Sequence, residues 1–172
     1  SFALVGMHAY MEVYGGDSQA RRIRNLLARR LFSQFHENEG PGWPWLEDVV
    51  TYSNGIIPFA LMLSGQWIPE GEMHALGLRA LRWLLEVQTD AESGHLSLIG
   101  NEKWMSRGGE RSKFDQQPIE IMSLILACGE AYRLTHDESW VHEARRCLDW
   151  FLGRNDLRVP VADFRTGGSY DG

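Results

Sequence analysis

The sequence predicts an all-α protein of antiparallel helical hairpins, arranged as about half of a six-hairpin α/α toroid. Apolar helical segments alternate along the 172-residue chain with amphipathic ones. The connections alternate as well, because each tight turn is followed, one helix later, by a long polar loop. The unit of buried helix, tight turn, half-exposed helix and long loop occurs three times, which is typical of a repeat architecture.

The first hairpin is predicted from residues 2–14 and from a second helix that ends near Phe35. Residues 2–14 are apolar on most sides, so we expect this helix to be buried. Asp17 or Ser18 is a suitable N-cap for the second helix, which has one apolar stripe. The arginines on its other faces form either a solvated surface or a patch for a polyanion: Arg21, Arg22, Arg24, Arg29 and Arg30.

The second hairpin is predicted from residues 52–63 and from an amphipathic helix that begins at Pro69. Pro58 lies inside the first segment and predicts a kink or a later start there. The third hairpin combines residues 118–134 with a helix that opens at Asp137 or Glu138 and ends near residue 152. Its opening proline suits the first helical turn, where a missing N–H costs nothing.

Three long loops separate these hairpins, at residues 36–51, 89–117 and 153–172. Antiparallel neighbours place alternate connections at opposite ends, so the long loops should share one end and the tight turns the other. Residues 93–120 form the most polar of these connections, and a short β-ribbon is conceivable near residues 95–99. Strand content should stay well below the globular average of about a fifth.

Composition excludes several classes of protein. The net charge of −6 argues against a nucleic-acid partner, and no apolar run is long enough to span a membrane. Cys128 and Cys147 indicate reduced thiols in a cytoplasmic protein, and no Cys/His spacing suits a metal, so neither a metal nor a cofactor is expected. We expect one domain over residues 1–172. The start at Ser1 and the glycine-rich end suggest a piece of a longer protein.

The loops carry the residue types that recognise carbohydrates. Aromatic rings cover the flat apolar faces of a sugar, while carboxylates and amides bind its hydroxyl groups. Asp48, Asp115 and Glu120 are candidate catalytic residues, since paired carboxylates can run glycoside hydrolysis. The candidate ligand-binding residues are Trp43, Trp45, Glu47, Asn54, His95, Asn101, Trp104, Gln116, Gln117, Asn155, Asp156 and Asp163.

Several of these residues also have structural interpretations, which the sequence leaves open. Trp43 and Trp45 would serve as a plug at the end of the helical array. Glu47, Asp48 and Glu120 suit the start of a helix, where acidic side chains cap free N–H groups or interact with the helix dipole. Structural roles in turns or in the core are equally open for His95, Asn155 and Asp156.

The loop motifs resemble a known family. They include Trp43-Pro44-Trp45-Leu46-Glu47-Asp48, Tyr52-Ser53-Asn54, Gly94-His95-Leu96-Ser97, Gly100-Asn101, Asn155-Asp156, Asp163 with Thr166-Gly167-Gly168, and the most specific run, Phe114-Asp115-Gln116-Gln117-Pro118-Ile119-Glu120. Together they resemble a bacterial α/α-toroid domain, the C-terminal part of some group 1 glycosyltransferases and a component of related sugar-metabolism proteins. The chain departs from that pattern at Ser169, where a cysteine is common, and it holds no nucleotide-sugar-binding domain.

Three functional hypotheses follow. The resemblance implies a carbohydrate-recognising domain of a larger glycosyltransferase, with a sugar or glycan bound at the long-loop end. The carboxylates allow a second hypothesis, a glycosidase-like or epimerase-like enzyme. The third is a protein-interaction scaffold that uses the open edge of the array. Because an open edge exposes apolar side chains, we also expect a homo-oligomer or a contact with further parts of the protein.

Overall fold

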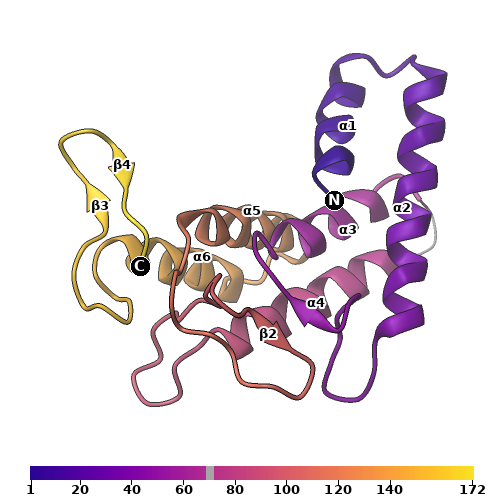
Figure 1. Cartoon of the computed structure of the whole chain (residues 1–172). Coiled ribbons are helices and arrows are strands. Elements are labelled where there is room, and N and C mark those ends of the chain that lie inside the picture. The colour runs from indigo at the N-terminus through magenta and orange to yellow at the C-terminus, as the bar shows by residue number, and fades with distance from the viewer. Residues whose placement is uncertain (69–71) are drawn as a thin grey trace.

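The computed structural model describes residues 1–68 and 72–172 (Figure 1). These residues form the helices α1 (Phe2–Val13), α2 (Ser18–Asn38), α3 (Ile56–Gly65), α4 (Glu72–Val87), α5 (Pro118–Thr135) and α6 (Ser139–Phe151). Two antiparallel ribbons pair β1 (Val49–Val50) with β2 (Met105–Ser106) and β3 (Ala162–Asp163) with β4 (Gly168–Ser169). The predictions of a mostly helical fold and of little strand are therefore confirmed.

The helices pack as three successive hairpins. α1 packs on α2, α3 on α4 and α5 on α6, and α3 also contacts both α1 and α5. The first helices of the hairpins therefore form one row, with α3 in its middle, and α3 is buried over most of its length. The expected burial of α1 is wrong, since only Leu4 and Met11 are buried there. α1 lies at the end of the row, and among the described residues its main helix contacts are with α2 and α3.

Two helix starts depend on local features, a capping side chain at α2 and a backbone conformation before α3. The side chain of Asp17 accepts a hydrogen bond from the N–H of Ala20, which confirms Asp17 as the N-cap of α2. α3 begins at Ile56 rather than at residue 52, because Ser53 adopts a left-handed φ of 51° and ends any continuous helix. Pro58 thus falls in the first turn of α3 and marks a late start. The predicted start of α4 at Pro69 lies outside the described residues.

The three long loops meet at one end of the array, as predicted. Val49 of the first loop pairs with Ser106 of the second. Asp156 of the third loop accepts a hydrogen bond from the Ser97 hydroxyl of the second. Instead of a ribbon at residues 95–99, the structure shows one isolated bridge, between Thr89 and Leu96. Figure 1 shows the α1–α2 hairpin on one side of the array and the β3–β4 ribbon projecting from the other.

Gly55 allows the start of α3 to approach the backbone of α5. A Cβ atom at this position would lie 2.5 Å from the carbonyl carbon of Ser123 and 2.6 Å from the nitrogen of Leu124. Backbone atoms cannot move aside as a flexible side chain can. We therefore expect Gly55→Ala to lower the free energy of unfolding by about 1–3 kcal/mol, measured by urea denaturation. Gly16→Ala is the matched control, because nothing lies within 4 Å of its Cβ, and equal effects of the two changes would contradict this packing.

Candidate functional site

Glu120 is the centre of a buried hydrogen-bond network in the first turn of α5. Its Oε2 atom accepts hydrogen bonds from the backbone N–H of Asn54 at 2.8 Å and from the Asn54 amide at 3.1 Å. Its Oε1 atom accepts one from the side-chain amide of Gln88 at 3.3 Å. Glu120 therefore does not cap its own helix. It joins α5 to the turn before α3 and to the end of α4.

The electrostatics of Glu120 are unusual. Burial raises the pKa of its carboxyl group to about 7, although the hydrogen bonds from Asn54 and Gln88 act in the opposite direction. A carboxyl pKa near neutrality is a property of catalytic acids and bases. Glu120, however, is 3% exposed and does not line the cavities found along α4, α5 and α6 or beside α1 in the described part of the chain. Substrate would not reach this carboxylate in the present conformation.

A second network is centred on Asp156 and joins two of the long loops. Its Oδ2 atom accepts hydrogen bonds from the Ser97 hydroxyl at 2.6 Å and from the Gln116 amide at 2.5 Å. Its Oδ1 atom lies 2.7 Å from Nε2 of His95. Burial raises the pKa of Asp156, but these hydrogen bonds outweigh burial and hold the pKa below its usual value. The structure thus brings together three predicted residues: His95, Gln116 and Asp156.

Both networks hold the extended segment that follows His95. Oε1 of Gln116 accepts hydrogen bonds from the N–H of Leu98 at 3.1 Å and from the indole of Trp150 at 3.2 Å. Oε1 of Gln88 accepts one from the N–H of Ile99 at 2.9 Å. Gln88 was not among the predicted site residues. Gln88 directly follows α4 and continues the helical spacing of the buried residues Leu81, Leu84 and Leu85. A buried amide at such a position needs partners, and this was the available signal.

His95 also contacts Ser93, which invites comparison with a catalytic triad. The Ser93 hydroxyl lies 2.5 Å from Nδ1 of His95. It also donates to Oδ1 of Asp90 at 2.7 Å, and the hydrogen bonds from Ser93 lower the pKa of Asp90 to about 2. A nucleophilic serine must give its proton to histidine, whereas this one is oriented toward a carboxylate. The group therefore closes a turn.

Trp43 and Trp45 lie in the core. Their rings pack against Trp83, with centroid distances of 5.0 and 5.8 Å, and Trp45 also meets the edge of Phe35 at 6.0 Å. The indole of Trp43 donates to the carbonyl of Glu47 at 2.8 Å. Both residues are buried, so their faces are not open to a ligand in this conformation.

The remaining predicted residues occupy turns and the surface. The exposed carboxylate of Asp48 lies 3.1 Å from Nε of Arg107. Asn155 is buried and donates to the carbonyls of Trp150 and Val159, while Asp163 closes the turn before β4 by accepting from Thr166. Glu47 is exposed, and Gln117 stands at the N-cap position of α5 without capping it.

Four neighbouring loop residues form an exposed group, which we call the Trp104 platform: Asn101, Trp104, Phe114 and Asp115. The N–H of Asn101 donates to the carbonyl of Asp115 at 2.9 Å, and Oδ1 of Asn101 accepts from the indole of Trp104 at 3.0 Å. Trp104 is 39% exposed and Phe114 is 73% exposed. Trp104 and Asp115 both adopt left-handed φ values, of 57° and 63°, an uncommon conformation that clusters at functional sites.

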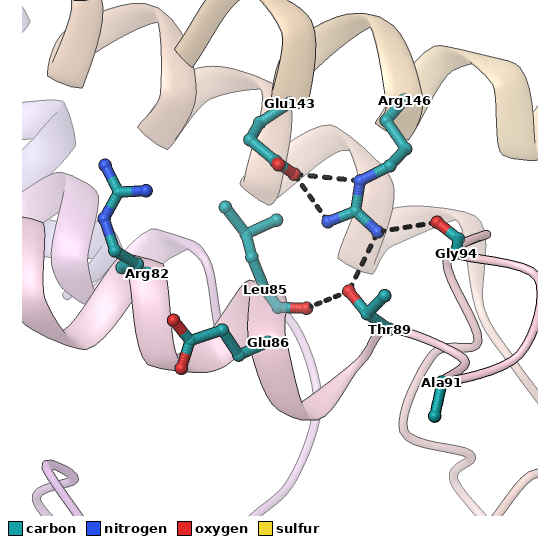
Figure 2. A pocket seen from close by; sticks show the side chains of 8 residues that line it. All are labelled: Arg82, Leu85, Glu86, Thr89, Ala91, Gly94, Glu143 and Arg146. Atoms are coloured by element: carbon teal, nitrogen blue, oxygen red, sulfur yellow. Dashed lines mark hydrogen bonds and ion pairs between the residues drawn. The ribbon is translucent and has the colours of Figure 1, made fainter. Parts of the chain in front are cut away.

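The largest of the described cavities lies elsewhere, between α4, α6 and the turn after α4 (Figure 2). It has a volume of about 600 Å³, and no predicted residue lines it. Arg146 is held there by Glu143 at 2.5 and 2.9 Å, by the Thr89 hydroxyl at 2.9 Å and by the Gly94 carbonyl at 3.4 Å. Because four of the five N–H groups of Arg146 already donate to these partners, we regard it as a structural link between α6 and this turn.

The described residues contain no group of three or more His, Cys, Asp or Glu side chains arranged for a metal. Cys128 and Cys147 are free and buried, and their mutual contact together with burial raises the pKa of Cys147. The thiol form of Cys147 is thereby favoured.

No helix in the described part of the chain is long and apolar enough to cross a membrane. Comparisons of the chain with protein-family models, with curated proteins and with solved structures found no match.

Proposed function

We propose that this chain is a carbohydrate-recognising helical domain of the α/α-toroid type, which serves a larger glycosyltransferase and binds a sugar or glycan at its long-loop end. The observation that carries this proposal is the Trp104 platform. It combines two exposed aromatic rings with an exposed carboxylate, and the Asp115 side chain makes no hydrogen bond or ion pair with the described residues. Such a surface suits a ligand with flat apolar faces and many hydroxyl groups.

The platform is organised before any ligand arrives. The hydrogen bond from the Trp104 indole to Asn101 fixes the ring, and the N–H of Asn101 fixes the backbone of Asp115. A Cβ atom at Gly100 would lie 1.9 Å from the carbonyl oxygen of Phe114, so the two loop segments are in direct contact. A rigid platform loses little conformational entropy on binding, which favours affinity.

The helical arrangement supports the toroid part of the proposal. The row of α1, α3 and α5 corresponds to the inner layer of a ring, and α2, α4 and α6 correspond to the outer layer. α3 and α5 both begin at the long-loop end, where their free N–H groups attract anionic or hydroxyl-rich ligands. The residues buried at this end then hold the loops in place, rather than contact the sugar.

Asp115→Asn tests the proposal, because it keeps the shape of the side chain and removes its charge. A hydrogen bond from a sugar hydroxyl to a charged carboxylate contributes roughly 1.5–3 kcal/mol. We therefore expect the affinity for the bound sugar to fall by about 10- to 100-fold. Calorimetric titration with mono- and oligosaccharides measures this change, and the melting temperature should be little affected since Asp115 is exposed.

Asp137→Asn is the matched control, because Asp137 lies in the tight turn between α5 and α6 and its carboxylate already accepts a hydrogen bond from the N–H of Ser139. Its affinity should equal that of the wild type. A sugar that binds the wild type and Asp115→Asn equally well would remove Asp115 from the site. Failure of every sugar class to bind would count against the function itself.

The structure gives the alternative functions unequal support. A paired-carboxylate enzyme would need a second acid beside Glu120, yet the network of Glu120 consists of the amides of Asn54 and Gln88. The interaction scaffold is favoured by a specific observation, an apolar face on the last hairpin. That face does not overlap the Trp104 platform, so the two functions are compatible.

A further inference from the structure

The last hairpin exposes a continuous apolar face, which we call the α5–α6 edge. A groove of about 530 Å³ runs between α5, α6 and the β3–β4 ribbon, and a second groove of about 380 Å³ adjoins it. Leu148, which is 50% exposed, lines both grooves. Its exposed apolar neighbours are Met122, Val141, Leu152 and Phe164. Exposed apolar residues that gather in this way are typical of interaction sites.

The first hairpin carries an apolar face of its own, the α1–α2 edge. A shallow groove of about 170 Å³ lies between these helices, with Leu4 and Leu31 among the residues that line it. Leu27 lines the same groove and is 36% exposed, and Leu26 and Ile23 are exposed on the same helix. The apolar residues at positions 23, 26 and 27 form a stripe at helical spacing.

The packing inside the chain shows which kind of surface fits such an edge. Each hairpin docks on the next through its first helix, since α1 contacts α3 and α3 contacts α5. In the last hairpin, the α5–α6 edge is equivalent to the face of the α3–α4 hairpin that packs against α5. A partner that continues the row must therefore present the face that a hairpin turns toward the hairpin before it. In the described part of the chain, the α1–α2 edge is the free edge of that kind.

We propose that a second copy of the chain covers the α5–α6 edge, docking its α1–α2 edge there head to tail. The contact continues the helix row with the same hairpin-on-hairpin packing that the chain already uses. A head-to-tail contact either closes into a ring of copies or continues as an open filament. Two copies that form the contact twice, once at each end, make the smallest closed ring, because each copy has both edges. A pair with two reciprocal contacts leaves no free edge, whereas a single contact leaves one at each end. We therefore expect a closed dimer.

Arginine substitutions on the two edges test the contact. Leu148→Arg and Leu27→Arg each place a charge in an apolar interface, while each side chain is exposed enough to be changed without unfolding the monomer. Sedimentation equilibrium of the full chain should show a dimer for the wild type. Each variant should raise the dissociation constant at least about tenfold. Leu157→Arg is the control, because Leu157 is exposed in the last loop and lines neither edge, and it should dimerise like the wild type.

Mixing the variants separates the possible geometries. A head-to-tail dimer of Leu148→Arg with Leu27→Arg retains one undamaged contact, so the mixture should associate more strongly than either variant alone. If two α5–α6 edges met each other instead, Leu27→Arg would dimerise normally and the proposal would be overturned. A monomeric wild type at micromolar concentration would overturn it as well. Because no sugar is present in these measurements, their outcome is independent of carbohydrate binding.

Discussion

Replacing Trp45 by alanine is expected to lower the free energy of unfolding by about 3–5 kcal/mol, the range found when large aromatic side chains are removed from a core. Trp45 is 1% exposed and packs against Phe35 of α2 and Trp83 of α4. Its loss leaves a cavity between the first and second hairpins, which the surrounding helices can fill only in part. Urea denaturation at neutral pH measures the change, with the denaturant slope as a check on two-state behaviour.

Trp104→Ala is the matched control for this prediction. The Trp104 ring is 39% exposed and stands on the platform rather than in the core, so its removal should cost less than about 1 kcal/mol. The two tryptophans therefore separate stability from binding. A small effect at Trp45, or a large effect at Trp104, would show that the assignment of core and platform is reversed.

The second large effect is a pH dependence that originates at Glu120. Its pKa is 4.5 in an unfolded reference and about 7 in the folded chain. Between these values the folded state keeps a proton that the unfolded state has lost. The stabilisation is therefore complete below pH 4.5 and disappears as the pH rises through about 7. From pH 5 to pH 8 this group should lower the free energy of unfolding by roughly 2.5 kcal/mol.

Glu120→Gln isolates this contribution, because glutamine does not titrate. Histidines and other carboxylates also change stability with pH, and they are common to both proteins. The quantity to follow is therefore the difference in unfolding free energy between wild type and Glu120→Gln, from pH 5 to pH 8. As the pH rises, the wild type should lose roughly 2.5 kcal/mol of unfolding free energy relative to Glu120→Gln. A constant difference would mean that Glu120 is already ionised at pH 5 in the folded chain.

The sequence was sufficient to predict most of the helices because their signals are local. Apolar periodicity located α2, α5 and α6, and Asp17 and Pro118 marked two of the helix starts. The prediction was less accurate where tertiary structure decides. The burial of α1 depends on its place at the end of the row. The start of α3 depends on the left-handed conformation of Ser53.

The site was harder to predict, because its contacts join distant positions. Asn54 and Glu120 are 66 residues apart, and His95 and Asp156 are 61 apart. The sequence identified all four as candidates, but it could not show whether their side chains face a ligand or each other. The role of each tryptophan is ambiguous in the same way. Trp43 and Trp104 have the same side chain, and only packing places one in the core and the other at the surface.

The most direct test of the proposed function is a nuclear magnetic resonance titration of the wild-type chain with oligosaccharides. The indole N–H signals report on each tryptophan separately, and single Trp→Phe variants assign them. The proposal predicts that the Trp104 indole signal and the backbone amides of Asn101 and Asp115 shift on saturation, while the buried Trp45 indole does not. Binding that shifts signals at another surface and leaves Trp104 unchanged would contradict the proposal.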